Sequence, residues 1–586
     1  MATSVSQRPL LVALLTLAVW IASFGGFGGR GHLHEYTFAA LMALSANEAI
    51  FYVGAAVAQL FFVGGLGVFA ARAWGKRADR IARALFAQRR VVLMSLAAGS
   101  AALALVVAVF VVRRHTITED EKTYLFQAKL LLTGRLSAPM PPGADAFREP
   151  FLVSANGRWS GQYFWAQPAL LALGVVAHAP YLVPALEVGC TTLFTGLLVD
   201  ELTSDRRAAV LAAVVVATSP IVVMTGATLL NANLSAACVA VSLYALAKLH
   251  RAPDRAATWA LALSTAVGLH NRALDHAAVL AGAACVLFVA HRGARLAIVR
   301  RLLPAVAIAL PLLALHLLFN QAVSGDWRHS GYWLHSQGKH RILMGFGVGQ
   351  GGFPQDVWTA SEKTVANVIR MAFYTGGGPL LFAPLAVGFV AGDSRGFLRA
   401  AAWIVGVYYV AYFFYAAASI TTTGPVYFDA LVPVLAGAAA VATTKLHDAV
   451  KLRPGFDRLV PALVLAQLVA GFLFFWPPAL LELGRAANDS AACDDLASRL
   501  DPSRPALVFV APAESYSSWT FWKPMPSPTL DDRVLFAKTG GPATDAAVAA
   551  SVSPDRSVYF ARCVAAPDPK IERYDPASGR VAPLDL

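Results

Sequence analysis

The sequence predicts an all-α polytopic membrane protein with a small α/β domain at its C-terminal end. Of the 586 residues, 57% are hydrophobic and only 14% are charged, and the mean hydropathy is +0.57. Soluble domains are about 45–50% apolar and about 25% charged, so most of this chain is expected to lie in lipid. From residue 477 onwards the long apolar windows stop, and short apolar runs between turn residues indicate strands.

About thirteen membrane-spanning helices are expected, because a span needs about 20 mainly apolar residues. They lie near residues 9–29, 48–71, 91–112, 183–201, 208–226, 232–249, 257–270, 274–291, 302–320, 375–392, 398–418, 429–443 and 459–476. The first lacks a small-x-small cleavage site and is expected to be retained as a helix. The apolar, proline-bounded segment 166–182 is interpreted as half-inserted, since counting it as a span would invert every later helix.

The net charge of +13 indicates orientation in a membrane rather than binding of nucleic acid. Lys and Arg gather in short loops between apolar segments, as the positive-inside rule predicts for cytoplasmic loops. The main basic stretches are Arg72–Arg90, Lys248–Arg255, Arg292–Arg301 and Lys445–Arg458. They follow every second span and therefore lie on one side. The long loops 113–182 and 321–374 and the tail then share the other, outer side.

The tail has its own architecture. A polar, helix-like start is followed by apolar runs at 506–512, 533–538 and 557–563, which suggests a small α/β domain. Cys493 and Cys563 bracket these runs, and an oxidising outer compartment would allow them to pair. The spacing alone leaves this disulfide open, because its geometry is not readable from sequence.

Two adjacent acids, Asp120 and Glu121, stand just after the third predicted span. One interpretation is structural, because Thr118-x-x-Glu121 has the pattern of a helix capping box. The other is chemical, because a carboxylate at the outer mouth of a bundle can accept a proton from an acceptor hydroxyl. The two are compatible, since a cap would fix the acids at the membrane surface.

The same acids carry a resemblance to a known family. Asp120-Glu121-x-x-Tyr124, followed by Ala128 and Gly134, resembles the first-loop motif of the GT-C superfamily of integral membrane glycosyltransferases. Within it, the likeness is to the protein O-mannosyltransferase and aminoarabinose-transferase branch. GQYFWAQPALLALG at 161–174 is similar to the family's Tyr-x-Pro-Gly-x-Pro-x-Leu-Leu segment, although Ala166 stands where a proline or glycine is common.

Later segments continue the resemblance over most of residues 115–440. They are SPIVVMTGATLLNANL (219–234), GLHNRALDH (268–276), FNQAVSGDWRHSGY (319–332) and GPVYFDALVPVLAG (424–437). Asn231 and Asn233 occupy positions near which the family often has an acid. Val426 replaces the arginine of the family's Gly-Pro-Arg-Tyr motif, which puts a phosphate role at that position in doubt.

The resemblance implies a polyprenyl-phosphate sugar donor, inversion at the sugar carbon and an aspartate general base. By this transfer Asp120 is the expected base, and Glu121 is a helper or a ligand for a divalent metal if one is used. No cofactor is otherwise expected. The chain then divides into N-terminal transmembrane helices (1–112), a GT-C-like catalytic region (113–476) and an extracytoplasmic tail (477–586).

Arg272 is the main candidate for binding the donor phosphate. An arginine at membrane depth is expensive and usually pairs with an anion. That anion is either Asp275, three residues on at helical spacing, or the phosphate, which fits a guanidinium fork. The further substrate-binding candidates are Tyr124, His270, Arg148, Arg158, Lys339 and Tyr427.

His329, His335 and His340 in the second outer loop match no metal-binding motif. Their aromatic and basic neighbours are typical of a membrane interface. The glycine-rich 345–354 follows no strand of a βαβ unit, so a flexible loop is expected there rather than a nucleotide cradle.

Two rival classes remain open. A transporter or flippase usually carries ionisable or helix-breaking positions at the midplane of paired repeats, whereas the polar chemistry here gathers in the outer loops. A non-catalytic scaffold would bind cell-envelope glycan through its tail. The second outer loop shows no inserted soluble domain, which favours a bacterial inner membrane over the endoplasmic reticulum. The acceptor, whether glycan, lipid or protein, stays open.

Overall fold

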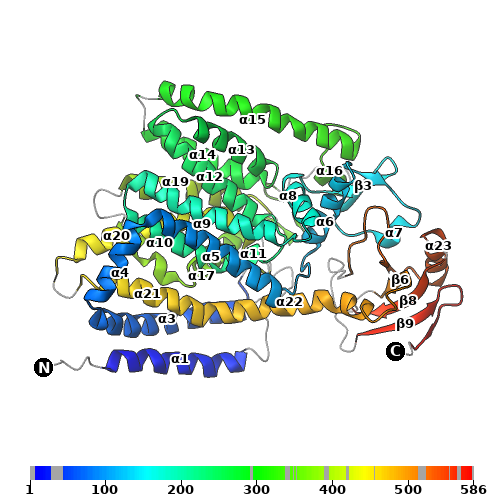
Figure 1. The fold of residues 1–586 in the computed structure, drawn as a ribbon, viewed down its shortest axis with the longest axis horizontal. Helices are drawn as coiled ribbons and strands as arrows, with labels where there is room; N and C mark the ends of the chain where they lie inside the picture. Colours follow the sequence, from blue (N-terminus) through cyan, green and yellow to red (C-terminus); the bar gives the residue numbers. More distant parts are fainter. Residues whose placement is uncertain are drawn as a thin grey trace.

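The computed structural model describes residues 7–27, 44–290, 293, 295–336, 344–347, 349–350, 353–388, 395–416, 422–453, 456–511, 523–552, 555–563 and 569–583. Its helices form one bundle, and a small sheet lies beyond the end where the long helix α22 (Trp476–Ala497) leaves that bundle (Figure 1). The expected fold class, a polytopic helical bundle with a small C-terminal α/β domain, is confirmed.

Small side chains let the helices of the bundle approach closely. The bundle contains α1 (Arg8–Phe27), α3 (Ala46–Ala73), α5 (Arg89–Phe110), α9 (Leu182–Thr203), α10 (Arg206–Ala217), α11 (Pro220–Gly226), α12 (Ala232–Arg251), α13 (Arg255–Leu269), α14 (Ala273–Ala290), α15 (Arg295–Ser324), α17 (Val357–Gly376), α19 (Arg395–Phe413), α20 (Val432–Val450) and α21 (Leu459–Ala470). A Cβ on Gly189 of α9 would lie 3.0 Å from the Ala97 carbonyl oxygen of α5. This is the small-residue packing typical of membrane helices.

The outside of the bundle is apolar. Phe110, Met94, Leu318 and Val19 are among its large exposed side chains. A soluble protein rarely exposes so much contiguous apolar surface. In hydrocarbon the same surface is favourable, because a helix satisfies its own backbone hydrogen bonds.

Eight described helices are long and apolar enough to cross a membrane, and nine if α10 and α11, bent by 51°, form one span. About thirteen had been expected from the length of apolar windows. The difference comes from four segments. α1 and α14 count as shorter apolar helices, α13 has 15 residues, and 375–392 breaks into a 3₁₀ turn (Pro379–Phe382) and α18 (Ala383–Gly388).

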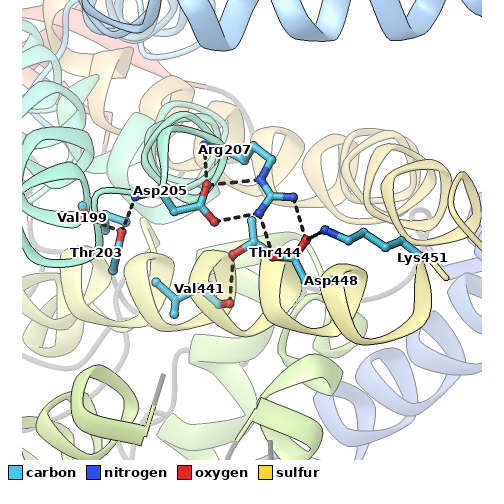
Figure 2. Close-up of polar contacts among 8 residues, drawn as sticks. All are labelled: Val199, Thr203, Asp205, Arg207, Val441, Thr444, Asp448 and Lys451. Atoms are coloured by element: carbon cyan, nitrogen blue, oxygen red, sulfur yellow. Dashed lines mark hydrogen bonds and ion pairs between the residues drawn. The ribbon is translucent and has the colours of Figure 1, made fainter. Parts of the chain in front are cut away.

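Charged side chains from the basic loops meet at the end of the bundle opposite the sheet. Arg207, at the start of α10, forms ion pairs with Asp205 at 3.1 Å and with Asp448 of α20 at 2.8 Å (Figure 2). Lys451 binds the same Asp448 at 2.8 Å. Beside them lies α4 (Lys76–Ala87), a short helix between α3 and α5 (Figure 1). These pairs tie neighbouring helices together at their basic ends.

The first outer loop is a compact folded unit. It contains α6 (Glu119–Leu132), β1 (Ala138–Pro139), α7 (Ala144–Phe147), β2 (Leu152–Ala155), β3 (Arg158–Gly161) and α8 (Ala166–Val176). The three strands form an antiparallel sheet in the order β1-β3-β2. A Cβ on Gly161 would lie 2.6 Å from the Gln127 side chain, so β3 rests directly on α6. α8 has 11 residues, and at about 1.5 Å per residue it is too short to cross a bilayer.

The second predicted outer loop differs from expectation in its second half. Residues Gly331–His335 form a short helix, α16, and β4 (Gly349–Gln350) pairs with β5 (Phe353–Pro354). Residues 357–374, however, belong to α17, which packs among the helices of the bundle. The charges that suggested a loop are buried there, because the Arg370 guanidinium forms a two-pronged pair with Glu48 of α3 at 2.7 Å.

The tail contains a mixed five-stranded sheet in the order β10-β9-β8-β6-β7. The strands are β6 (Ala506–Val510), β7 (Val534–Lys538), β8 (Ser557–Arg562), β9 (Lys570–Asp575) and β10 (Arg580–Ala582), and α23 (Pro542–Val552) accompanies them. β6 pairs in parallel with β7 and β8, while the other pairs are antiparallel. Cys493 of α22 and Cys563 form the disulfide that the sequence left open, with a Cα–Cα distance of 5.1 Å.

Candidate active site

Helix α6 begins at a capping box. Thr118 is extended, its hydroxyl accepts from the Glu121 backbone N–H at 3.4 Å, and the Glu121 carboxylate accepts from the Thr118 N–H at 3.1 Å. Glu121 also accepts from the backbone N–H groups of Ile117 at 3.0 Å and of Leu229 at 2.8 Å. Burial raises its pKa to about 7 against these hydrogen bonds. Glu121 therefore joins α6 to the turn before α12, which is a structural contact, and its role as a helper stays a prediction.

The chain reaches α6 through a sharp turn after α5. Arg113 and Arg114 both have positive φ, 56° and 59°. Such a conformation costs about 1–3 kcal/mol for a residue with a side chain, so it needs support from its surroundings. Arg113 binds Asn488 of α22 at 3.2 Å, and His115 lies 3.6 Å from Asp494 of the same helix. Helix α22 thus holds the turn that precedes the acids.

Asp120 lies beside Tyr163 and within the field of Arg272. The Tyr163 hydroxyl donates to Asp120 Oδ1 at 2.5 Å. Burial raises the pKa of Asp120, while the Tyr163 hydrogen bond and then the Arg272 charge act in the opposite direction. The ring of Tyr124 packs 4.6 Å from the ring of Tyr163. The structure therefore brings together four of the predicted residues, which are Asp120, Tyr124, Arg272 and Tyr427.

Arg272 follows the end of α13 and is held from three directions. Its Nε lies 3.3 Å from Asp275 Oδ2, and its Nη1 donates to the Val426 carbonyl at 2.6 Å. Its guanidinium carbon sits 4.6 Å from the centre of the Tyr427 ring. The pairing with Asp275 that the sequence offered as the structural alternative is present. It does not exclude a phosphate, because a guanidinium carries five N–H donors.

Tyrosine hydroxyls surround the Arg272–Asp275 pair. Tyr412 donates to Asp275 Oδ1, Ser235 donates to Asp275 Oδ2 at 3.0 Å, and Tyr408 donates to the Tyr427 carbonyl at 2.6 Å. Tyr332 and Tyr415 lie close enough to Asp120 and Arg272 to interact with both charges electrostatically. Hydroxyls of this kind bind phosphate or sugar oxygens by hydrogen bonds.

A further buried acid, Asp429, lies within the field of Arg272. Asp429 accepts from the Thr225 hydroxyl at 3.2 Å, and Asn233 donates to the same Thr225 oxygen at 2.8 Å. Asn233 is one of the two asparagines near which the family often has an acid. Asp429 belongs to the same 3₁₀ segment as Tyr427, Val426–Leu431.

His270 forms part of an aromatic wall close to this site. Its Nδ1 contacts the Ala266 carbonyl at 2.7 Å, so it caps the end of α13. Its ring lies 4.9 Å from Trp165 and 5.5 Å from His316. Tyr163 and Phe164 each pack edge-on against Tyr332 from the other side.

The remaining sequence candidates lie elsewhere. Arg148 is exposed beside His335, and Arg158 binds the Ser137 carbonyl at 2.5 Å within the small sheet. Lys339 and His340 lie outside the described residues. In the part of the chain that the structure covers, no three His, Cys, Asp or Glu side chains are grouped so as to hold a metal ion.

Several site residues were not selected from the sequence. Tyr163 lies within the quoted segment 161–174, but nothing in its spacing marks it as the partner of Asp120. Tyr408 and Tyr412 do carry a signal, since hydroxyls four residues apart on a predicted span lie on one helix face and need partners in lipid. Asp429 also carries a signal in the sequence, because an acid inside an apolar, membrane-spanning segment is a candidate functional residue.

The site therefore combines a buried carboxylate, a guanidinium and several hydroxyls at the mouth of the bundle. Asp120 can take a proton when ionised, and Arg272 can stabilise negative charge. Asp120 lies in the first turn of α6, and Arg272 lies between the end of α13 and the start of α14. Such a pair suits a displacement in which an acidic leaving group departs while a hydroxyl attacks.

A comparison with protein-family models gives no match, and neither does a comparison with curated proteins. Solved structures do match. ArnT from Cupriavidus metallidurans in the apo state is 14% identical, with a TM-score of 0.48 over 79% of this chain and 92% of that chain. The same protein bound to undecaprenyl phosphate is 13% identical, with a TM-score of 0.49 over the same shares.

The Archaeoglobus fulgidus oligosaccharyltransferase tethered with an acceptor peptide is 12% identical, with a TM-score of 0.46 over 73% of this chain and 62% of that chain. At these sequence identities and TM-scores, roles are assigned to individual residues from the contacts described above and not from the comparison.

Proposed function

We propose that this chain is a membrane glycosyltransferase of the GT-C type that transfers a sugar from a polyprenyl-phosphate donor to a hydroxyl acceptor outside the cytoplasm. The observation that carries the proposal is the placement of Asp120 within the field of Arg272, with Tyr163 bound to Asp120. One group can accept a proton and the other can bind a phosphate. A site with both beside lipid fits a lipid-phosphate sugar.

In the proposed reaction the donor approaches from the bilayer with its phosphate toward Arg272. The acceptor hydroxyl lies next to Asp120, which takes its proton as the oxygen attacks the sugar carbon. The new C–O bond forms as the bond between that carbon and the phosphate oxygen breaks. The lipid phosphate leaves with the electron pair, and Arg272 stabilises its charge. Attack opposite the leaving group inverts the sugar carbon.

We place the site and the tail on the extracytoplasmic side of a bacterial inner membrane, and two features of the structure support this orientation. The basic loops gather at one end, where Arg207, Asp448 and Lys451 meet, and positive loops usually stay cytoplasmic (Figure 2). The disulfide between Cys493 and Cys563 suits an oxidising compartment at the other end.

The test compares a deletion strain complemented with wild type, with Asp120→Asn or with Asp145→Asn. Asp145 is an exposed acid of the same loop and serves as a matched control. Mass spectrometry of glycolipids, polysaccharides and surface proteins should find a sugar-sized mass with wild type and Asp145→Asn only. The same product from Asp120→Asn, at equal membrane levels, would disprove the role of Asp120. A mass absent even with wild type would favour a transporter or a scaffold.

A further inference from the structure

The tail and the first outer loop share one hydrophobic core. Phe126 of α6, Phe147 of α7 and Trp159 of β3 are buried in the same cluster as Leu507, Leu535 and Tyr574 of the tail sheet. α7 packs against β7, and α6 and α7 both lie toward the end of the molecule that carries the tail sheet (Figure 1). A core drawn from both segments means that neither buries its apolar face without the other.

A buried pair of opposite charges crosses this contact. Lys523 of the tail lies 2.6 Å from Glu149 of the first outer loop, and these side chains are 1% and 0% exposed. Separating the two charges of a buried ion pair is costly, because each charge would be left away from water without a partner. Lys523 therefore fixes the segment that follows α7.

The charge of Lys523 also acts on a carboxyl group in the first turn of α6. Lys523 and Glu149 both act electrostatically on Glu119, whose carboxylate also lies 3.6 Å from Lys122 one turn along the helix. Glu119 is buried and is the residue directly before Asp120. Glu119, Lys122, Glu149 and Lys523 therefore form one buried polar cluster next to the candidate acid.

Two further contacts tie the same helix to the tail region. The Ser490 hydroxyl of α22 donates to the Thr116 carbonyl, two residues before the cap of α6. At the far end of α6, Lys129 lies 3.7 Å from Asp532 of the tail. Helix α6 is thus contacted by the C-terminal part of the chain at both ends.

We propose that Lys523 and Glu149 are positioning residues, through which the tail fixes α6 and places Asp120 for transfer. The inference rests on the proposed function of Asp120. Lys523 does not touch the reacting atoms; it acts through Glu149 and Glu119. The tail is then a part of the active site rather than a separate binding module.

The experiment uses the full chain in lipid nanodiscs and compares Lys523→Met with wild type. Lys538→Met, an exposed lysine of the same tail, is the matched control. Hydrogen exchange of α6 is measured first, because it needs no substrate. In Lys523→Met the amides of the first turns of α6 should exchange about tenfold faster, while α12 stays unchanged. Unchanged exchange in α6 would overturn the proposal.

Transfer kinetics separate positioning from simple stability. A misplaced acid should lower kcat, by about a hundredfold for a shift of about 1 Å, and leave the donor KM near its wild-type value. Lys523→Arg, which keeps the charge, should recover most of kcat. Faster α6 exchange with wild-type kcat, or a change in KM alone, would overturn the proposal.

A double variant covers the case in which Lys523→Met fails to fold. In Glu149→Gln/Lys523→Met both charges are removed, so no buried charge is left unpaired. This variant should fold with its disulfide formed and recover exchange protection relative to Glu149→Gln alone. If the effects of Glu149→Gln and Lys523→Met on α6 exchange were additive in the double variant, the proposed pairing of the two side chains would be overturned. If wild type transferred no sugar, the proposed function would fail, and the exchange data would still decide whether Lys523 holds α6.

Discussion

The Tyr163 hydroxyl hydrogen-bonds Asp120 Oδ1 at 2.5 Å, linking the segment between β3 and α8 to the first turn of α6. The bond lies between two segments of the first outer loop that the small sheet already holds together. It stabilises the ionised form of Asp120, because a carboxylate accepts a hydroxyl hydrogen better than a carboxylic acid does. Burial acts in the opposite direction, so the Tyr163 hydrogen bond favours the ionised carboxylate that the proposed role of Asp120 requires.

Replacing Tyr163 by Phe should shift the pH dependence of transfer to higher pH. The hydrogen bond lowers the pKa of Asp120, so its loss raises that pKa and leaves Asp120 protonated where wild type is ionised. Activity should be reduced at low pH and approach wild type as pH rises. The measurement is kcat against pH. Tyr574→Phe, in the tail, is the control, and an unshifted acid limb in Tyr163→Phe would disprove the coupling.

Arg272→Lys should weaken use of the donor while the protein still folds. Lysine keeps one positive charge, but it loses the fork that contacts Asp275 and the Val426 carbonyl at once. The donor KM is expected to rise about ten- to a hundredfold, the scale of a hydrogen bond to a charged group. Arg135→Lys, an exposed arginine of the first outer loop, is the control. An unchanged KM in Arg272→Lys would contradict the phosphate role.

Glu119→Gln should remove part of a pH dependence of stability. Burial raises the pKa of Glu119 from its ordinary 4.5 to about 8. Between these values the unfolded state has released the proton and the folded state keeps it, so stability falls as pH rises through this range. Thermal melting from about pH 5 to about pH 9 should show a shallower decline in Glu119→Gln than in wild type. Identical slopes would contradict a protonated Glu119.

The buried Glu48–Arg370 pair predicts strong coupling between α3 and α17. Arg370→Met should destabilise the bundle by about 3–5 kcal/mol, because Glu48 is left buried without its bidentate partner. Glu48→Gln/Arg370→Met should be milder than the sum of the single changes. The measurement is thermal unfolding in detergent, with Arg399→Met as an exposed control. Additive losses would show that the two side chains do not act as a pair.

The bundle could be predicted from the sequence wherever apolar residues run without interruption. The prediction failed at α17, where Lys363, Asn367 and Arg370 gave the segment the polarity of a loop. These side chains are buried because partners come from distant parts of the chain, such as Glu48 of α3 for Arg370. Hydropathy measures the residue alone and carries no information about such a partner.

The candidate site was also predictable only in part, because sequence patterns report local order and not distant partners. Asp120, Tyr124 and Arg272 stand in motifs with local order, and the capping box around Thr118 and Glu121 depends only on neighbouring residues. Contacts across long sequence distances were not predictable. Tyr163 meets Asp120 over 43 residues, and Tyr412 meets Asp275 over 137.

The core shared by the first outer loop and the tail has a consequence for biosynthesis. The chain emerges N-terminus first, and domains generally fold in the order of synthesis. Lys523 contacts the Phe147 carbonyl across 376 residues, so the surroundings of α6 stay incomplete until almost the whole protein has been made. In a chain still on the ribosome, α6 therefore lacks its contacts with the tail, and a prematurely terminated chain never forms them. Under the proposed function, Asp120 is held in place for transfer only once the tail has been synthesised.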